Sequence, residues 1–311
     1  MAGFFQFRLR FSDVTLRVVG ARATDRPAPD PEEPPFLLLH GFPEFWYSWR
    51  RLMPLLVEGG AKPRRAYALD QRGFGASSKP KRVRAYRLEL LAKDVARVIG
   101  RLSPRRREAY LVGHDWGGAV AWEVARRYPG RVKRLWVLNC PPVEVLLKAV
   151  RELPRQFLMS WYVYFFQLPF LPEHFLSGRG ASRVIKMMGA VRAGPGGSRT
   201  PVDELERYRA AYSQPRGASG INYYRAAVRS ALLGQAWSGR RGSPAPKVRC
   251  PTRVIWGARD LALSTELVRY FPPLVEPGKL RFTFLPRASH FVQLDHPEQC
   301  AAAILGDVEP C

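Results

Sequence analysis

Hydrophobic and polar residues alternate with a period of two at the start of the chain. Every second residue from Phe5 to Phe11 is apolar, and Val14, Leu16 and Val18 repeat the pattern after a short Ser-Asp turn. Successive side chains of a strand point to opposite faces, so this alternation predicts an opening antiparallel hairpin with one buried face.

Later segments are apolar throughout or carry apolar residues at helical spacing. The short apolar runs are Phe36–Leu39, Ala66–Leu69, Tyr110–Val112 and Leu135–Leu138. The helical patterns that separate them are Ser48–Val57, Leu88–Leu102 and Gly117–Tyr128. Strands covered by helices on both faces have such apolar runs. The order of the segments therefore predicts an α/β fold with a doubly wound, mostly parallel sheet.

This rhythm stops after Pro141 and returns only with strand patterns at Thr252–Trp256 and Leu280–Phe284. The segment between is aromatic and helical in pattern. We therefore expect a helical lid, or cap domain, inserted between two strands of one α/β core. The expected divisions are residues 1–140 for the first part of the core, 141–246 for the lid and 247–311 for the second part of the core.

The longest apolar run extends from Phe157 to Leu171 and is interrupted by Gln167 and Pro169. A membrane-spanning helix needs about 20 apolar residues, so we predict no transmembrane segment. We interpret the run as an aromatic-rich helix under the lid, with docking on a membrane surface as the less favoured alternative.

Composition limits the remaining possibilities. Fifty Lys and Arg against 26 Asp and Glu give a formal net charge of +24, and 41 of the 50 cations are arginine. The arginines are dispersed and accompany no nucleic-acid-binding motif, so no specific nucleic-acid partner is expected. The four cysteines have no metal-binding spacing, and no signal peptide is apparent. We expect no metal and a cytoplasmic location with reduced thiols.

The pentapeptide Gly113-His-Asp-Trp-Gly117 follows the third apolar run. A side chain at the apex of a tight strand-to-helix turn needs very small neighbours, which the two glycines supply. A carboxylate at the apex can attack an sp3 carbon, and water must then hydrolyse the resulting enzyme ester. Asp115 is therefore the predicted nucleophile, although the pentapeptide alone is equally compatible with an ordinary Gly-Asp turn.

Other motifs stand in register with this turn. They are His40-Gly-Phe-Pro43 followed by Glu44 to Trp49, Asp70 to Ser78, Trp256-Gly-Ala-Arg-Asp260, and Ser289-His290. In order and spacing the set resembles the α/β-hydrolase fold family and, within it, the epoxide hydrolases, over nearly the whole chain. The resemblance implies an α/β-hydrolase fold with a helical cap and a reaction that needs no cofactor.

The triad follows from chain order and chemistry. In hydrolases with a strand-to-helix nucleophile turn, the order along the chain is nucleophile, acid, histidine. Asp260 and His290 follow Asp115 in the same order. His290 is predicted to deprotonate water, and Asp260 to orient the imidazole and stabilise its cation. Some relatives carry the acid after the strand that precedes the lid, but Asn139 stands there and cannot serve.

The resemblance also implies roles in the loops and the lid. The backbone N–H groups of Phe42 and Trp116 are expected to form an oxyanion hole. Tyr162 and Tyr224 stand where the family has its ring-opening pair, and their neighbours Tyr164 and Tyr223 remain alternatives. The expected substrate pocket includes His40, Pro43, Phe157, Trp161 and Phe165.

These residues together predict hydrolysis of a small apolar epoxide by water to a vicinal diol, through a covalent hydroxyalkyl ester on Asp115. A haloalkane dehalogenase with the same Asp-His-Asp triad is the first alternative. One group of those enzymes has asparagine at the place of Phe42, which weakens this alternative. A non-catalytic ligand-binding protein of the same fold is the second, and the intact triad weakens it. A homodimer is possible.

Overall fold

The structure of the protein is a computed structural model, and it describes residues 3–23, 26–176, 201–233 and 245–308. In these residues, eight strands form one sheet in the order β1-β2-β4-β3-β5-β6-β7-β8. The strands are β1 (Gly3–Arg10), β2 (Thr15–Arg22), β3 (Phe36–Leu39), β4 (Ala66–Leu69), β5 (Ala109–His114), β6 (Val132–Leu138), β7 (Thr252–Gly257) and β8 (Leu280–Leu285). The opening hairpin is antiparallel, β2 pairs antiparallel with β4, and the other pairs are parallel. The predicted mostly parallel sheet is thus confirmed.

The apolar strands separate two hydrophobic cores. Leu37 and Leu39 of β3 belong to the core on one face, whereas Phe36 and Leu38 belong to the core on the other. Each face is covered by helices, so every side chain of β3 is buried. This two-sided burial explains why the strand is apolar throughout instead of alternating.

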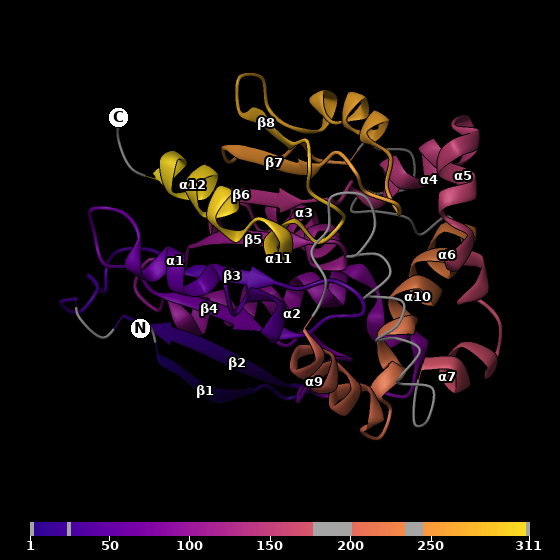
Figure 1. Cartoon of the computed structure of the whole chain (residues 1–311), viewed down its shortest axis with the longest axis horizontal. Helices are drawn as coiled ribbons and strands as arrows, with labels where there is room; N and C mark the ends of the chain where they lie inside the picture. Colours follow the sequence, from indigo (N-terminus) through magenta and orange to yellow (C-terminus); the bar gives the residue numbers. More distant parts are fainter. Residues whose placement is uncertain (1–2, 24–25, 177–200, 234–244, 309–311) are drawn as a thin grey trace.

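Helices cover both faces of the sheet (Figure 1). The helices of the core are α1 (Leu52–Glu58), α2 (Leu88–Leu102), α3 (Trp116–Arg127), α11 (Val292–Asp295) and α12 (Pro297–Val308). Short 3-10 segments are η1 (Trp46–Trp49), η2 (Val83–Tyr86), η3 (Pro129–Arg131), η5 (Gly217–Gly220), η6 (Thr265–Tyr270) and η7 (Pro272–Leu274). The helix predicted over Ser48–Val57 is divided between η1 and α1. Pro54 can occupy only the first turn of a helix, because its ring would clash with the carbonyl group of Arg50 in a longer one.

Six described helices lie between β6 and β7, where the inserted lid was predicted. They are α4 (Val143–Glu152), α5 (Pro154–Met159), α6 (Trp161–Phe165), α7 (Leu171–Leu176), α9 (Val202–Ser213) and α10 (Ile221–Leu232). They gather at one end of the sheet, with α5, α6 and α7 at the edge of the molecule (Figure 1). None of the described helices is both long enough and apolar enough to cross a bilayer.

The interpretation of the Phe157–Leu171 run as a helix under the lid was wrong. The run forms α5, α6 and the connection to α7, and much of it faces outward. We call its most exposed apolar residues the outer lid surface: Phe157, Leu158, Trp161, Tyr164, Leu168, Phe170 and Leu171, with exposed fractions from 45% to 85%. Only one face of such short helices reaches the protein interior, and on α6 and the residue that follows it Tyr162 and Phe166 occupy that face.

Candidate active site

Asp115 lies at the tight turn between β5 and α3. Its backbone φ of 48° and ψ of −124° are rare for a residue with a side chain and strain the turn. A Cβ atom on Gly117 would lie 2.0 Å from the carbonyl oxygen of Leu39, and one on Gly113 would lie 2.4 Å from that of Gly117. The two glycines are therefore required by the close approach of strand and helix, as the pentapeptide predicted.

The order of the strands brings the loop after β3 next to this turn. β3 pairs with β4 on one side and β5 on the other, so the chain reverses its direction of winding here. Such switch points at the carboxyl ends of parallel strands are common ligand sites. The Phe42 N–H donates a 2.7 Å hydrogen bond to Oδ1 of Asp115. Trp116 begins α3, and the first N–H groups of a helix have no acceptor within the helix.

His290 lies between two carboxylates. Its Nε2 is 3.6 Å from Oδ2 of Asp115, and its Nδ1 is 2.7 Å from Oδ2 of Asp260. Burial disfavours the charged ring, but the charges of Asp260 and Asp115 outweigh burial and raise the pKa of His290 well above its usual range. Burial also opposes ionisation of Asp115, yet the His290 cation beside it lowers the pKa of that carboxyl overall. One hydrogen bond, to Asp260, and one ion-pair contact, to Asp115, thus bring the three residues together.

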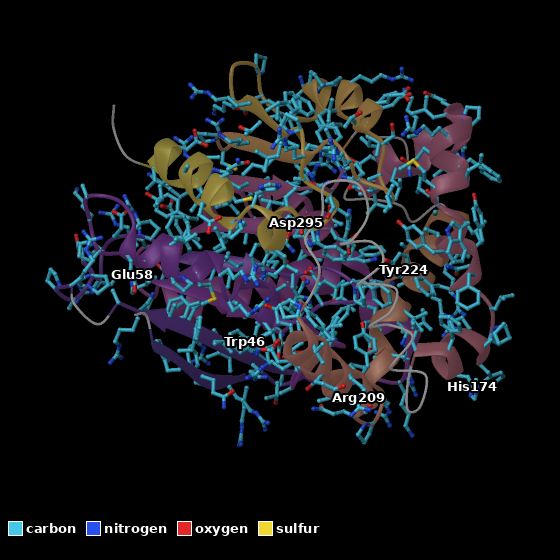
Figure 2. The ribbon with its side chains drawn as sticks, viewed as in Figure 1. Trp46, Glu58, His174, Arg209, Tyr224 and Asp295 are labelled. Atoms are coloured by element: carbon cyan, nitrogen blue, oxygen red, sulfur yellow. The ribbon has the colours of Figure 1, made fainter. Side chains whose placement is uncertain are left out.

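The two lid tyrosines meet above Asp115. Tyr162 comes from α6 and Tyr224 from α10, with ring centroids 5.8 Å apart at right angles, and the Tyr224 ring packs edge-on against Trp116. Tyr224 lies on the side of the lid nearer the core (Figure 2). Burial raises the pKa of both phenols, and the Asp115 charge adds to the effect. Both hydroxyls therefore remain protonated at neutral pH.

The neighbouring tyrosines lie elsewhere. Tyr164 is 49% exposed on the outer side of α6. Tyr223 is buried, but its hydroxyl donates to the Arg72 carbonyl oxygen at 2.8 Å. Of the two adjacent pairs, the structure thus brings Tyr162 and Tyr224 to the cavity that contains Asp115.

An apolar cavity extends from Asp115 into the lid. Its lining includes Asp115, Trp116, Ala119, Cys140, Pro141, Val143, Leu146, Leu147, Tyr162, Val163, Tyr224, Ala227, Val228 and Leu263. Among these, one carboxylate and two phenols supply the strongly polar groups, and the rest of the wall is aliphatic, aromatic or a thiol. A reacting group can therefore be oriented only at the Asp115 end, while the remainder of a ligand meets apolar side chains.

Comparison with known proteins identifies the family. The alpha/beta hydrolase fold family matches residues 34–297. The chain belongs to this family. Human Epoxide hydrolase 4 is 34% identical over 295 residues, which cover 93% of this chain and 75% of that protein. The AB hydrolase superfamily protein YfhM of Bacillus subtilis is 33% identical and covers 91% of both chains.

A solved structure supports the same placement. Epoxide Hydrolase A from Mycobacterium thermoresistibile superposes with a TM-score of 0.77 at 25% identity, over 98% of each chain. Because the chain shares more than 30% identity with curated epoxide hydrolases over most of their length, it is a member of the epoxide hydrolase group of α/β hydrolases.

The expected substrate pocket needs correction. None of His40, Pro43, Phe157, Trp161 and Phe165 is in the cavity lining. His40 is fully buried, and its ring bonds the Gly41 carbonyl oxygen and the Gln71 N–H, so it holds the loop together. Trp161 is 64% exposed because it lies on the side of α6 opposite the cavity. The apolar wall comes instead from side chains of α3, α4, α6 and α10 together with Cys140, Pro141 and Leu263, most of which no sequence motif marked.

Asn139 has a structural part in the site that sequence reasoning missed. It was correctly excluded as the acid, but its side-chain amide donates to Oδ2 of Asp260 at 2.6 Å, and its Oδ1 accepts from the Gly257 N–H. The other oxygen of Asp260 accepts from the N–H groups of Ala262 and Leu263. These donors satisfy the oxygens of the buried carboxylate and fix its position beside His290.

A second buried network links the loop after β3, the turn that carries Asp115 and the segment that carries His290. Glu44 accepts from the Gly41 N–H and from Gln293, and its Oε2 is 2.8 Å from His114 Nδ1. The other ring nitrogen of His114 lies 2.9 Å from the His290 carbonyl oxygen. The nearby His114 lowers the pKa of Glu44 despite burial, which by itself raises it. In the sequence, Glu44 directly follows the motif His40-Gly-Phe-Pro43. This position was the sequence feature that could have indicated a role for Glu44 in the site.

Proposed function

We propose that the protein hydrolyses apolar epoxides to vicinal diols in two steps. The observation that carries the proposal is the pair of protonated phenols, Tyr162 and Tyr224, in the same apolar cavity as the Asp115 carboxylate. An epoxide needs a nucleophile at carbon and an acid at oxygen, and this cavity contains both. Several relatives, among them human Epoxide hydrolase 4, have names that agree with this reaction.

In the first step, Oδ2 of Asp115 attacks an epoxide carbon. The carbon–oxygen bond of the ring breaks as the new ester bond forms, and a tyrosine proton passes to the epoxide oxygen. Without an acid the leaving group would be an alkoxide, which is far too basic to depart readily at neutral pH. The raised pKa of Tyr162 and Tyr224 keeps both phenols in the protonated form that this step consumes.

In the second step, water attacks the ester carbonyl group of Asp115. Esterification removes one of the two charges that raise the His290 pKa, so the imidazolium can pass its proton to the tyrosinate left by the first step and then act as the base toward water. Oδ1 becomes the oxyanion and is stabilised by the N–H groups of Phe42 and Trp116. The ester bond then breaks, and the departing diol oxygen takes the proton that His290 received from water. The second water proton, left on the Asp115 carboxyl group, passes to His290, so the carboxylate and the imidazolium are both restored.

A single turnover in oxygen-18 water tests the covalent route. With enzyme in excess over styrene oxide, the first diol should carry unlabelled oxygen, because that oxygen comes from Asp115. Many turnovers should then give labelled diol, because each hydrolysis leaves one oxygen from water on the carboxylate. Mass spectrometry of the diol distinguishes the two cases, and labelled diol from the single turnover would rule out the ester.

A further inference from the structure

The outer lid surface concentrates exposed apolar side chains on the exterior of the molecule. Two ring contacts lie in it, with Phe157 5.6 Å from Tyr164 and Trp161 6.3 Å from the partly buried Phe165 between centroids. Phe170, at 85%, is the most exposed large apolar residue among those described. The helices α5, α6 and α7 that carry it form the edge of the molecule, where His174 is labelled (Figure 2). Such a concentration of exposed aromatic side chains marks an interaction surface.

The charges beside this surface are positive. Arg151 at the end of α4 and Arg155 in α5 are exposed, and neither has an acidic partner among the described residues. The nearby acids are already engaged, because Glu152 is 3.8 Å from Lys148 and Glu173 forms an ion pair with Arg225. The whole chain carries a formal charge of +24.

We propose that the outer lid surface docks on anionic phospholipid membranes. Aromatic side chains favour the boundary between headgroups and acyl chains, and each nearby cation adds attraction to an anionic leaflet. A second copy of the chain is the poorer partner, because two molecules of charge +24 repel each other. The charge complementarity therefore selects a lipid surface over self-association.

Docking would place the bilayer next to the wall of the cavity. The short helix α6 presents Trp161 and Tyr164 to the exterior, whereas Tyr162 and Val163 of the same helix line the cavity. One helix therefore separates the docked surface from the site. This proposal concerns binding alone and does not depend on which reaction the site performs.

Vesicle flotation of the purified full chain tests the proposal. The protein should float with vesicles of phosphatidylcholine and phosphatidylserine and much less with phosphatidylcholine alone. The double substitution Trp161→Ser with Phe170→Ser should lower the constant for binding to these vesicles by about tenfold or more, because it removes most of the inserted apolar area. Phe284→Ser, at an equally apolar residue 46% exposed on β8, is the matched control and should bind as the wild type does.

A second variant and its matched control test how much the charge of the lid contributes to vesicle binding. Arg151→Glu with Arg155→Glu should weaken binding to anionic vesicles, and high salt should reduce the difference between this variant and the wild type. Arg82→Glu with Arg84→Glu changes the net charge equally at two exposed residues outside the lid and should have the smaller effect. Circular dichroism of every variant verifies that the fold is retained.

Several results would overturn the proposal. They are absence of flotation, equal losses in the lid and control variants, and a larger loss from Arg82→Glu with Arg84→Glu. A dimer in light scattering that the Trp161→Ser and Phe170→Ser substitutions dissociate would instead assign the surface to a second copy of the chain. If the wild type floats with anionic vesicles and is a monomer in light scattering, the result supports docking on a lipid surface.

Discussion

At the scale of single residues, the candidate site places a histidine between two carboxylates. Asp115 and Asp260 both raise the pKa of His290, and the histidine cation lowers that of Asp115. The free site is therefore an ion pair of imidazolium and carboxylate. Formation of an ester at Asp115 would remove the negative charge of this pair. His290 would then change from a cation to a base.

This coupling predicts that the alkyl-enzyme accumulates as the pH falls. Asp115 of the free site stays ionised and reactive in acid because its pKa is lowered. In the ester, where the Asp115 charge no longer raises the His290 pKa, His290 becomes protonated as the pH falls and cannot activate water. The ester fraction, measured by intact mass after acid quenching during steady turnover of styrene oxide, should rise below neutral pH. The mass increase should equal that of the epoxide. An ester fraction that rises with pH would contradict the prediction.

A substitution supplies the control for this pH dependence. His290→Gln should trap the ester at every pH, because no base remains within reach of the hydrolytic water. His174→Gln changes an exposed histidine on α7 and should behave as the wild type. Rapid diol release by His290→Gln would assign the base to another group.

At the scale of elements, the site is assembled where a strand-to-helix turn of the core meets two helices of the lid. Asp115 comes from the β5–α3 turn, Tyr162 from α6 and Tyr224 from α10. The phenols pack on each other and on Trp116, so their positions depend on how the two lid helices lie over α3. In the proposed mechanism, epoxide opening therefore requires the core and the lid together.

Removal of the phenol hydroxyls should slow the first step selectively. Tyr162→Phe and Tyr224→Phe keep the ring packing and should each reduce the rate of ester formation roughly 100-fold, the usual contribution of a general acid. The double substitution should nearly abolish it. Stopped-flow measurement of ester formation gives the rate, and Tyr164→Phe, at an exposed residue of the same helix, should leave it unchanged. An equal loss in Tyr164→Phe would indicate a packing effect instead.

At the scale of the whole molecule, an ion-pair cluster attaches the lid to the core. Glu204 on α9 is buried and contacts Arg50 and Arg51, which lie between η1 and α1. Arg50 is nearly buried as well, so loss of the carboxylate would leave its charge in a poorly hydrated position. The cluster joins two parts of the chain that are about 150 residues apart.

Loss of this carboxylate should destabilise the protein. Glu204→Gln is expected to cost about 2 to 4 kcal/mol of unfolding free energy, less than for a fully buried pair because Arg51 is partly hydrated. Thermal and urea unfolding measure the change. Glu206→Gln alters an exposed carboxylate of the same helix that pairs only at the surface with Arg209, and it should cost well under 1 kcal/mol. Similar losses in both variants would contradict the assignment.

The sequence by itself determined the local features. Period-two alternation gave the opening hairpin, and uninterrupted apolar runs marked the two-sided strands. Small residues around Asp115 indicated the strained turn, because steric exclusion at Gly113 and Gly117 is a property of a few consecutive residues. The order of Asp115, Asp260 and His290 along the chain predicted the triad in the same way, through motifs that are each contiguous.

Only the tertiary structure decided which surfaces meet. Asn139 and Asp260 are 121 residues apart, and Glu44 and Gln293 are 249 residues apart, so no local pattern could reveal their hydrogen bonds. A helix of five residues, such as α6, makes fewer than two turns and has no periodicity to separate its faces. For this reason the sequence assigned Trp161 to the pocket, whereas the fold turns it outward and directs Tyr162 toward Asp115.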